Sequence, residues 1–289
     1  MIIVTGATGR LGKLVVEGLL TSVAASHIGV SVRDPAKAQA FADLGVRVRH
    51  GDFADPSSLR EAFEGASQVL VISSNSAGAG AVEQHRNAID AAVAVGARRI
   101  LYTSHMAASP HSAFAPMVDH AATEAVLQAS GVPFTSLRNG FYAESAVQFL
   151  SRGLGSGSLP LPEDGPVSWT AHPDLARAVV IALTEEGRLD GITPPLTSSE
   201  ALTFHDLAMI ASEITGRAMS RTVISDEDFR RRGIAHGLPE AQVDMGVGMF
   251  AASRAGEFSA VDPALEELLG SPPRTFRDVL AESQAAQAD

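Results

Sequence analysis

The stretch MIIVTGATGRLG (Met1–Gly12) decides the fold of this chain. Residues 2–5 form a short apolar run that predicts a buried strand, and a helical pattern follows directly. Three glycines lie between them, where a phosphate-binding turn requires them. Gly6 permits the tight turn, Gly9 lets the backbone approach a pyrophosphate, and Gly12 lets helix and strand pack closely. An ordinary turn is the alternative, but this position favours a dinucleotide site at the helix N-terminus.

Apolar strands alternate with helical patterns through the first half of the chain. The pattern predicts strands at residues 2–5, 28–32, 46–49, 68–72, 99–103 and 134–137. It predicts helices at residues 9–20, 35–44, 56–63, 81–95 and 117–130. Parallel strands need crossover connections, and the helices then cover both faces of the sheet. We therefore predict an α/β fold with a Rossmann-type, doubly wound parallel sheet.

The alternation breaks after Arg138, which indicates a second lobe. Residues 151–166 are rich in glycine, serine and proline and are predicted to be a loop or the edge of that lobe. The apolar stripe of a helix at 173–185 suggests that this segment returns to the main sheet. We predict a dinucleotide-binding domain over residues 1–150, joined by 167–187. A small, mostly helical C-terminal substrate lobe then takes 151–166 and 188–289, with a helix near 203–215 and a strand near 221–224.

Composition excludes several classes of function. The formal net charge is −11, and the one locally basic run, at residues 230–232, follows three acidic residues, so we expect no nucleic-acid partner. The chain has no cysteine, which rules out disulfides, thiolate zinc sites and cysteine nucleophiles. Neither a secretory signal nor a membrane-spanning stretch is evident, so we expect a cytoplasmic protein with no membrane partner. A homodimer is left open.

The end of the second predicted strand indicates which nicotinamide cofactor binds. An acidic residue there would hold the ribose 2′-OH of NAD, but Arg33 and Asp34 share this position. Arg33 follows the last apolar residue and suits a 2′-phosphate, with help from Lys37 and Arg10. Asp34 would then be a helix N-cap, although it could instead repel that phosphate. We favour NADP(H), with NAD(H) as the alternative.

Further residues at the ends of strands complete the predicted cofactor site. Asp52 and Phe53 follow the third strand, where a carboxylate can accept from the adenine amino group beside an aromatic ring; a turn aspartate is the alternative. Carboxyl ends of parallel strands are where such sheets bind ligands. The predicted cofactor-binding residues are Gly6, Thr8, Gly9, Arg10, Leu11, Gly12, Arg33, Lys37, Asp52, Phe53, Ser73, Ser74, Asn75, Thr103 and Ser104.

Several of these segments resemble a known family. The similar segments are GATGRLG (6–12), VRDPAKA (32–38), GDF (51–53), HRNAIDAAVAVGARRILYTS (85–104) and ATEAVLQASGVPFTSLRNGFY (122–142). They resemble the NmrA-like atypical short-chain dehydrogenases, and most of all their NAD(P)H:quinone oxidoreductase and triphenylmethane reductase branch. The similarity continues more weakly through VIALTEEG (180–187) and LLGSPPRTFRDVL (268–280). The resemblance implies a Rossmann domain, a small substrate lobe and a cleft between them.

Ordinary short-chain dehydrogenases carry a Tyr-x-x-x-Lys pair, which this sequence lacks. In that pair tyrosine protonates the developing alkoxide and lysine lowers the tyrosine pKa. The only lysines here are Lys13 and Lys37, and Tyr102 and Tyr142 have no lysine four residues later. A simple ketone leaves a strongly basic alkoxide and needs a positioned acid. A quinone gives a less basic hydroquinone anion, so the missing pair favours a quinone or dye acceptor whose reduction depends mainly on orientation.

His120 is the best candidate for proton delivery or substrate anchoring. By the resemblance, it holds the position of the lysine in isoflavone-reductase-like relatives, and histidine titrates near neutrality. Glu124 lies one helical turn later and could orient it; the alternative is that His120 only lines a pocket wall. We expect substrate contacts from His105, Met106, Asn139, Phe141, Tyr142 and Trp169. No histidine pair has metal-binding spacing with a supporting carboxylate, so no metal is expected.

Three functions are consistent with these residues. The leading hypothesis is an NAD(P)H-dependent reductase that passes a hydride to a quinone or a similar planar conjugated aromatic acceptor. A second is a tailoring enzyme acting on a polycyclic aromatic quinone in a biosynthetic pathway, with reduction coupled to oxygen chemistry. A third is an NmrA-like regulator that senses NAD(P) without turning it over. Oxidation of NADPH by quinones or cationic dyes would separate the enzymes from the sensor.

Overall fold

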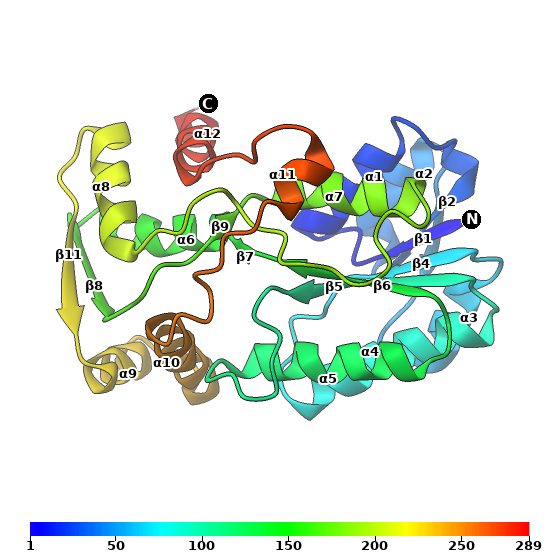
Figure 1. The fold of residues 1–289 in the computed structure, drawn as a ribbon, viewed down its shortest axis with the longest axis horizontal. Helices are drawn as coiled ribbons and strands as arrows, with labels where there is room; N and C mark the ends of the chain where they lie inside the picture. The colour runs from blue at the N-terminus through cyan, green and yellow to red at the C-terminus, as the bar shows by residue number, and fades with distance from the viewer. Residues whose placement is uncertain (289) are drawn as a thin grey trace. The chain divides into compact units, whose positions relative to one another are not determined.

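A computed structural model describes residues 1–288, which divide into two compact units (Figure 1). The first unit contains Met1–Pro110, Pro116–Asn139 and His172–Pro194. The second contains His111–Ala115, Gly140–Ala171 and the chain from Pro195 onward. Compared with the expected domains, residues 111–115, 140–150 and 167–171 lie in the second unit, and 188–194 lie in the first.

The first unit is built on a seven-stranded, fully parallel sheet. Its strand order is β10-β6-β5-β4-β1-β2-β3. The strands are β1 (Ile2–Thr5), β2 (Ile28–Val32), β3 (Arg47–His50), β4 (Gln68–Val71), β5 (Arg99–His105), β6 (Phe134–Asn139) and β10 (Gly191–Ile192). The chain runs outward from β1 to β3, then returns to the other side of β1, so the strand order reverses between β1 and β4. This confirms the predicted Rossmann-type, doubly wound sheet.

Helices cover both faces of this sheet, as Figure 1 shows. They are α1 (Arg10–Leu19), α2 (Gln39–Asp43), α3 (Pro56–Phe63), α4 (Ala79–Ala94), α5 (Ala115–Ala129) and α7 (His172–Thr184), with 3-10 turns at Ala25–His27 and Pro35–Ala38. On one face α1 packs against α7. A Cβ on Gly18 would lie 2.9 Å from Cγ2 of Val180, so this glycine permits the close approach. The opposite face is covered by α3, α4 and α5.

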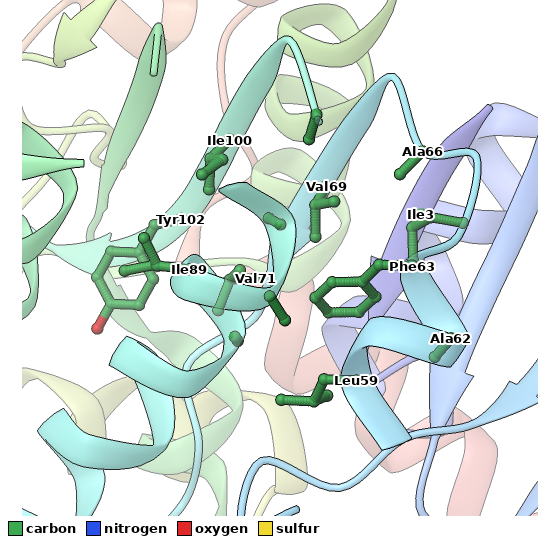
Figure 2. Close-up of a cluster of buried hydrophobic side chains, with 14 of the residues drawn as sticks. Ile3, Leu59, Ala62, Phe63, Ala66, Val69, Val71, Ile89, Ile100 and Tyr102 are labelled. Carbon is green, nitrogen blue, oxygen red and sulfur yellow. The ribbon is translucent and has the colours of Figure 1, made fainter. Parts of the chain in front are cut away.

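The core beneath α3 and α4 joins these helices to the central strands (Figure 2). Leu59 and Phe63 extend from α3, and Ile89 from α4, onto Ile3 and Val71 of the sheet. All five side chains are fully buried. Each buried side chain of this size contributes about 1.5–3 kcal/mol relative to leaving it in water. This packing holds the central strands, and therefore their carboxyl ends, in place.

The second unit is mostly helical, as predicted. Its helices are α6 (Ala143–Leu154), α8 (Phe204–Thr215), α9 (Asp226–Ala235), α10 (Glu240–Arg254), α11 (Ala264–Leu269) and α12 (Phe276–Ala288). Two short parallel ladders join β7 (Phe141–Tyr142) to β9 (Trp169–Thr170) and β8 (Ser158–Pro162) to β11 (Ser220–Ile224). No helix among residues 1–288 is both long and apolar enough to cross a membrane.

Two local predictions need correction. Residues 151–166 were expected to be a loop or the edge of the second lobe; they lie in the second unit, but α6 extends to Leu154 and β8 occupies Ser158–Pro162, so the loop alternative is wrong. The strand forms because β8 pairs with β11, about sixty residues later, and buries Leu159 and Leu161. The expected helix at 35–44 is a 3-10 turn (Pro35–Ala38) followed by the short α2.

Candidate active site

The glycine loop between β1 and α1 has the geometry of a phosphate cradle. Gly6 has a φ of +60°, which side chains other than glycine rarely adopt. The Gly9 N–H donates to the Gly6 carbonyl at 2.9 Å and closes the turn. A Cβ on Gly12 would lie 2.4 Å from that carbonyl oxygen and 2.9 Å from Cα of Ala7. Only glycine at position 12 therefore lets helix and loop approach this closely.

The N-terminus of α1 is suited to an anion. Gly9 is the N-cap, no side chain caps the helix, and its first turn contains no acidic residue. The first N–H groups of a helix lack intrahelical partners and carry partial positive charge. Thr8, Gly9 and Arg10 are exposed at this end, whereas Leu11 and Gly12 are buried against the unit. The loop therefore fits a dinucleotide diphosphate.

The residues after β2 favour a phosphate over a ribose hydroxyl. Oδ1 of Asp34 accepts from the Ala36 N–H at 3.1 Å, and its Oδ2 lies 4.0 Å from Nζ of Lys37. This confirms the alternative that Asp34 caps the following turn. Arg33 and Lys37 are both exposed. Arg33 directly follows Val32, the last residue of β2.

Asp52 and Phe53 follow β3, where they form a turn. Oδ1 of Asp52 accepts from the Ala54 N–H at 2.9 Å, and the Asp52 N–H donates to Oγ of Ser58 at 3.0 Å. The ring of Phe53 meets that of His85 edge to face, with centroids 6.4 Å apart. Both Asp52 and Phe53 are half-buried. Asp52 thus has the bonds of a turn aspartate, and one side of the Phe53 ring is already occupied.

Hydrogen bonds tie the end of β4 to its two neighbours. The Ile72 N–H donates to Oγ1 of Thr5, and the Ser73 N–H donates to Oγ1 of Thr103, each at 2.9 Å. Thr103 and Ser104 are buried, and the Ser104 hydroxyl donates to Glu124 at 2.8 Å. Their hydroxyls therefore already have protein partners, which makes them supports of the strand ends. Ser73 and Ser74 are half-buried, and Asn75 is exposed.

His85 of α4 is a buried histidine whose hydrogen bonds fix its tautomer. Its Nε2 accepts from the Ser74 N–H at 2.9 Å. Burial, and then the proximity of His120, lower the pKa of His85 to about 4, so the ring is neutral at pH 7. The proton therefore lies on Nδ1, which donates to Oγ1 of Thr123 at 3.0 Å. That hydroxyl in turn donates to the Asp119 carbonyl at 2.8 Å.

His120 of α5 bonds to Tyr102 of β5. The Tyr102 hydroxyl lies 2.7 Å from Nδ1 of His120, and the rings are 5.7 Å apart. The ring of His105 stacks on that of His120 at 6.1 Å. Burial lowers the pKa of His120 to about 4 and that of His105 well below its usual range. Both rings are therefore neutral at pH 7, at the carboxyl end of β5.

Glu124 has partners other than His120, which corrects the expectation that it orients that ring. Its side chain is 4% exposed and accepts from the hydroxyls of Ser104 and Ser136 at 2.8 and 2.9 Å. Nε and Nη2 of Arg138 donate to its two oxygens at 3.0 and 2.7 Å. Glu124 therefore ties α5 to β5 and β6, and the group that orients His120 is Tyr102.

Asn139 ends β6 directly beside His105 in the sheet register. Its backbone carbonyl accepts from the Met106 N–H at 2.8 Å. The Asn139 side chain is 1% exposed, and within residues 1–288 neither its amide oxygen nor its nitrogen has a hydrogen-bond partner. Buried amides usually have partners. Met106, His105 and Asn139 thus lie together at the ends of β5 and β6.

The other three predicted substrate contacts lie in the second unit. Trp169 is 2% exposed, and its Nε1 donates to the Leu202 carbonyl at 3.1 Å. Phe141 meets Trp169 edge to face at 5.2 Å, and Tyr142 is half-buried. Trp169 is therefore part of an aromatic core that supports Phe141. No group of three histidine, aspartate or glutamate side chains with metal-binding geometry occurs in the described residues.

Comparisons with known proteins agree with this geometry. Residues 1–269 match the NmrA-like family. The chain belongs to the NmrA-like family. Quinone oxidoreductase 2 of Escherichia coli K12 is 36% identical to it over 289 residues, covering 96% of both chains. An E. coli NADPH-dependent quinone oxidoreductase complexed with NADPH has a TM-score of 0.92 at 34% identity, covering 98% of this chain and 99% of the other. Citrobacter triphenylmethane reductase with NADP(H) has a TM-score of 0.90 at 34% identity, with the same coverage.

Four residues of this NmrA-like site were not predicted from the sequence: His85, Tyr102, Thr123 and Arg138. For His85 a signal was present, because Ala81, Ala88 and Ala92 share its face of α4, and a histidine among them is buried against the sheet. Tyr102 lies in the middle of an apolar strand, where both faces are buried. Nothing in its local sequence indicates that its hydroxyl reaches a helix eighteen residues later.

The buried histidines are expected to make the NmrA-like fold sensitive to mild acid. Their folded-state pKa values lie below the unfolded value of about 6.5, so the unfolded chain binds more protons as the pH falls below 6.5. Their contribution to stability is therefore complete above pH 6.5 and is lost toward pH 4. Between pH 7 and 5 we expect a loss on the order of 2 kcal/mol for each histidine.

Urea unfolding at pH 7 and pH 5 measures this loss. The variant His85→Gln should show a smaller difference between the two pH values than the wild type. His27→Gln is the control, because His27 is exposed. Equal pH differences in all three proteins would contradict the prediction.

Proposed function

We propose that this protein passes a hydride from NADPH to a quinone or a similar planar, conjugated acceptor. At the coarser level it is an NAD(P)H-dependent oxidoreductase of the NmrA-like family, with NADP(H) as its cofactor. Bound NADPH would supply the two-electron hydride. The observation that carries the proposal is the Gly6–Gly12 loop, which leaves no room for a Cβ at Gly12 and lies where the strand order reverses.

The residues proposed to hold the cofactor follow the ends of β1, β2 and β3. The loop and the N-terminus of α1 would bind the diphosphate, Arg33 the 2′-phosphate, and Asp52 with Phe53 the adenine. Ser73, Ser74 and Asn75 would border the cofactor after β4. Because Thr103 and Ser104 already have protein partners, we propose that they position this edge by supporting the ends of β4 and β5.

The preference for NADPH is expected to depend on Arg33. Hydrogen bonds to a charged group are worth roughly 1.5–3 kcal/mol, so Arg33→Ala should raise the Kd for NADPH about 10- to 100-fold. The Kd for NADH, which lacks the 2′-phosphate, should stay within about twofold. Fluorescence titration with both nucleotides measures this. Arg60→Ala, at an exposed arginine of α3, is the control. Equal weakening of both nucleotides by Arg33→Ala would refute the role.

The proposed class of acceptor follows from the absence of a Tyr-x-x-x-Lys pair in this chain. Without a Tyr-x-x-x-Lys pair, reduction of a simple ketone has no directly placed acid of the usual kind. A quinone or an extended dye spreads the added charge over a conjugated system and needs mainly orientation. His105, Met106 and Asn139 lie together at the ends of β5 and β6 and are proposed to contact such an acceptor. Two related reductases, of quinones and of triphenylmethane dyes, support this choice.

Steady-state oxidation of NADPH with a panel of acceptors tests the proposal. The panel contains naphthoquinones, benzoquinones, a cationic triphenylmethane dye and a simple aromatic ketone. We expect kcat/KM for the quinones to exceed that for the ketone by at least about 100-fold, the size of effect that a missing general acid produces. Comparable values for the ketone, or tight NADPH binding without oxidation by any acceptor, would contradict it. The second outcome would favour a nucleotide sensor.

A further inference from the structure

Tyr102 is a buried tyrosine that is not part of a Tyr-x-x-x-Lys motif. We propose that Tyr102 supplies the proton for the reduced acceptor and passes it through the ring of His120. The inference rests on the proposed quinone reduction and adds the source and route of its proton. Tyr102 acts on the substrate only through His120, so it is a positioning residue, and His120 is the group that contacts the acceptor.

The direction of this route follows from His85. Its Nε2 accepts from a backbone N–H, so its Nδ1 carries the proton and is a donor. That nitrogen lies 3.5 Å from the Tyr102 oxygen. The tyrosine O–H therefore does not donate to His85. The 2.7 Å contact with Nδ1 of His120 has the length typical of an O–H donor, so we assign the tyrosine proton to this bond.

His120 then carries its own proton on Nε2. Its Nδ1 is the acceptor, and the pKa lowered by burial keeps the ring neutral at pH 7. Within residues 1–288 the only hydrogen bond of the His120 side chain is the one to Tyr102. Nε2 is the second ring nitrogen, separated from Nδ1 by one carbon, and His120 is half-buried. An N–H donor is therefore left for a substrate oxygen.

The proton transfer balances as a double shift. After the acceptor gains a hydride, its oxygen carries a negative charge. A bond forms between this oxygen and the proton of His120 Nε2, whose N–H bond breaks. The Tyr102 O–H bond breaks at the same time, and its proton moves to Nδ1. The products are a neutral hydroquinone, a neutral His120 in its other tautomer and a Tyr102 phenolate. Water then returns a proton to Nε2 of His120, whose Nδ1 proton moves back to the buried Tyr102 oxygen, so both groups regain their starting state.

The free energy of this proton transfer is closer to zero for a reduced quinone than for a ketone alkoxide. A hydroquinone is a phenol, so its pKa lies near that of tyrosine, about 10, and the proton shift is close to balanced. A ketone alkoxide is much more basic and needs an acid with a lowered pKa during hydride transfer, which the lysine of a Tyr-x-x-x-Lys pair provides and a neutral His120 does not. Two neutral histidines, His85 and His120, lie within 3.5 Å of the Tyr102 hydroxyl. The Nδ1–H of His85 donates to Thr123 and lies 3.5 Å from the Tyr102 oxygen, while the Asp119 carboxylate accepts from the Gly78 N–H at 2.7 Å.

Two acceptors with different proton requirements test the inference. A quinone needs a hydride and a proton, whereas a cationic triphenylmethane dye becomes neutral on gaining a hydride alone. Tyr102→Phe should lower kcat for the quinone at least about tenfold at pH 8 while kcat for the dye stays within about twofold. The quinone rate of the variant should fall further as the pH rises, because solvent must supply the proton. The wild-type kcat for the quinone should change little between pH 6.5 and 8.5.

The controls distinguish a failure of this inference from misfolding of the variant and from a failure of the proposed function. Unchanged NADPH affinity and melting temperature would show that Tyr102→Phe is folded, and His27→Gln, at an exposed site, should leave both rates unchanged. If Tyr102→Phe slows dye and quinone alike, or neither, the inference is wrong although the proposed function stands. If the wild type reduces neither acceptor, the proposed function fails as well.

A readout without turnover tests the hydrogen-bond direction. Nuclear magnetic resonance of the ¹⁵N-labelled protein distinguishes a protonated ring nitrogen from an unprotonated one. We expect Nε2–H and a bare Nδ1 on His120, and Nδ1–H with a bare Nε2 on His85. His120→Gln identifies the resonances. A proton on Nδ1 of His120 at pH 7 would overturn the assignment.

Discussion

Replacing Gly12 with alanine is expected to weaken NADPH binding roughly 100-fold. The added Cβ would lie 2.4 Å from the Gly6 oxygen and 2.8 Å from its carbonyl carbon. These atoms are backbone, so the turn itself must move, and the N–H groups at the start of α1 move with it. Because the diphosphate is proposed to bind these N–H groups, its site is lost even if the rest of the sheet is unchanged.

The matched control for Gly12→Ala is Gly80→Ala. Gly80 lies near the start of α4, and a Cβ there meets no atom within 4 Å. Alanine is the better helix former, so this variant should keep the wild-type Kd and gain slightly in stability. Isothermal titration with NADPH gives the affinities, and circular dichroism confirms folding. Wild-type NADPH affinity in Gly12→Ala would disprove the role of the loop.

The second large effect is expected at Glu124. Its removal leaves the Arg138 guanidinium without the carboxylate that accepts two of its N–H groups. It also leaves the hydroxyls of Ser104 and Ser136 without an acceptor. Removing one partner of a buried ion pair costs about 3–5 kcal/mol of unfolding free energy. Because the Arg138 side chain is 28% exposed, Glu124→Ala should lose about 3 kcal/mol, the lower end of this range. Urea unfolding at pH 7 measures the loss.

Two comparisons sharpen the test of Glu124. Glu17→Gln removes one partner of the exposed pair with Lys13, 3.8 Å apart in α1, and should cost at most about 0.5 kcal/mol. The double variant Glu124→Gln/Arg138→Met should be more stable than Glu124→Ala, because no unpaired charge remains. A loss for Glu124→Ala as small as that for Glu17→Gln would mean that the pair does not hold α5 to the strands.

The sequence alone predicts the first unit well. The strands Ile2–Thr5 and Ile28–Val32 and the helix Pro56–Phe63 have the expected bounds. Each is a short apolar run or a proline-started helix between turn residues, so local periodicity is enough. The strand Ser158–Pro162 was missed because its pairing partner is remote and its neighbours are glycine and serine.

The site was predictable only in part, for the same reason. The glycine loop is a local motif, and Asp34 was foreseen as a cap because capping involves the next two residues. His120 was found from its position, but its partner was assigned to Glu124, one helical turn away. The hydrogen-bond partner of His120 is Tyr102, which lies in a strand. Glu124 forms an ion pair with Arg138 instead. Contacts between a helix and the sheet beneath it depend on packing that no local pattern encodes.

The most direct test of the account is a single-turnover reaction of the NADPH-bound protein with a naphthoquinone, using NADPH that carries deuterium at the transferable position. The account predicts that nicotinamide oxidation and quinone reduction proceed together, one for one, and that deuterium slows both. NADPH that stays bound and unoxidised in the presence of quinone would contradict the account.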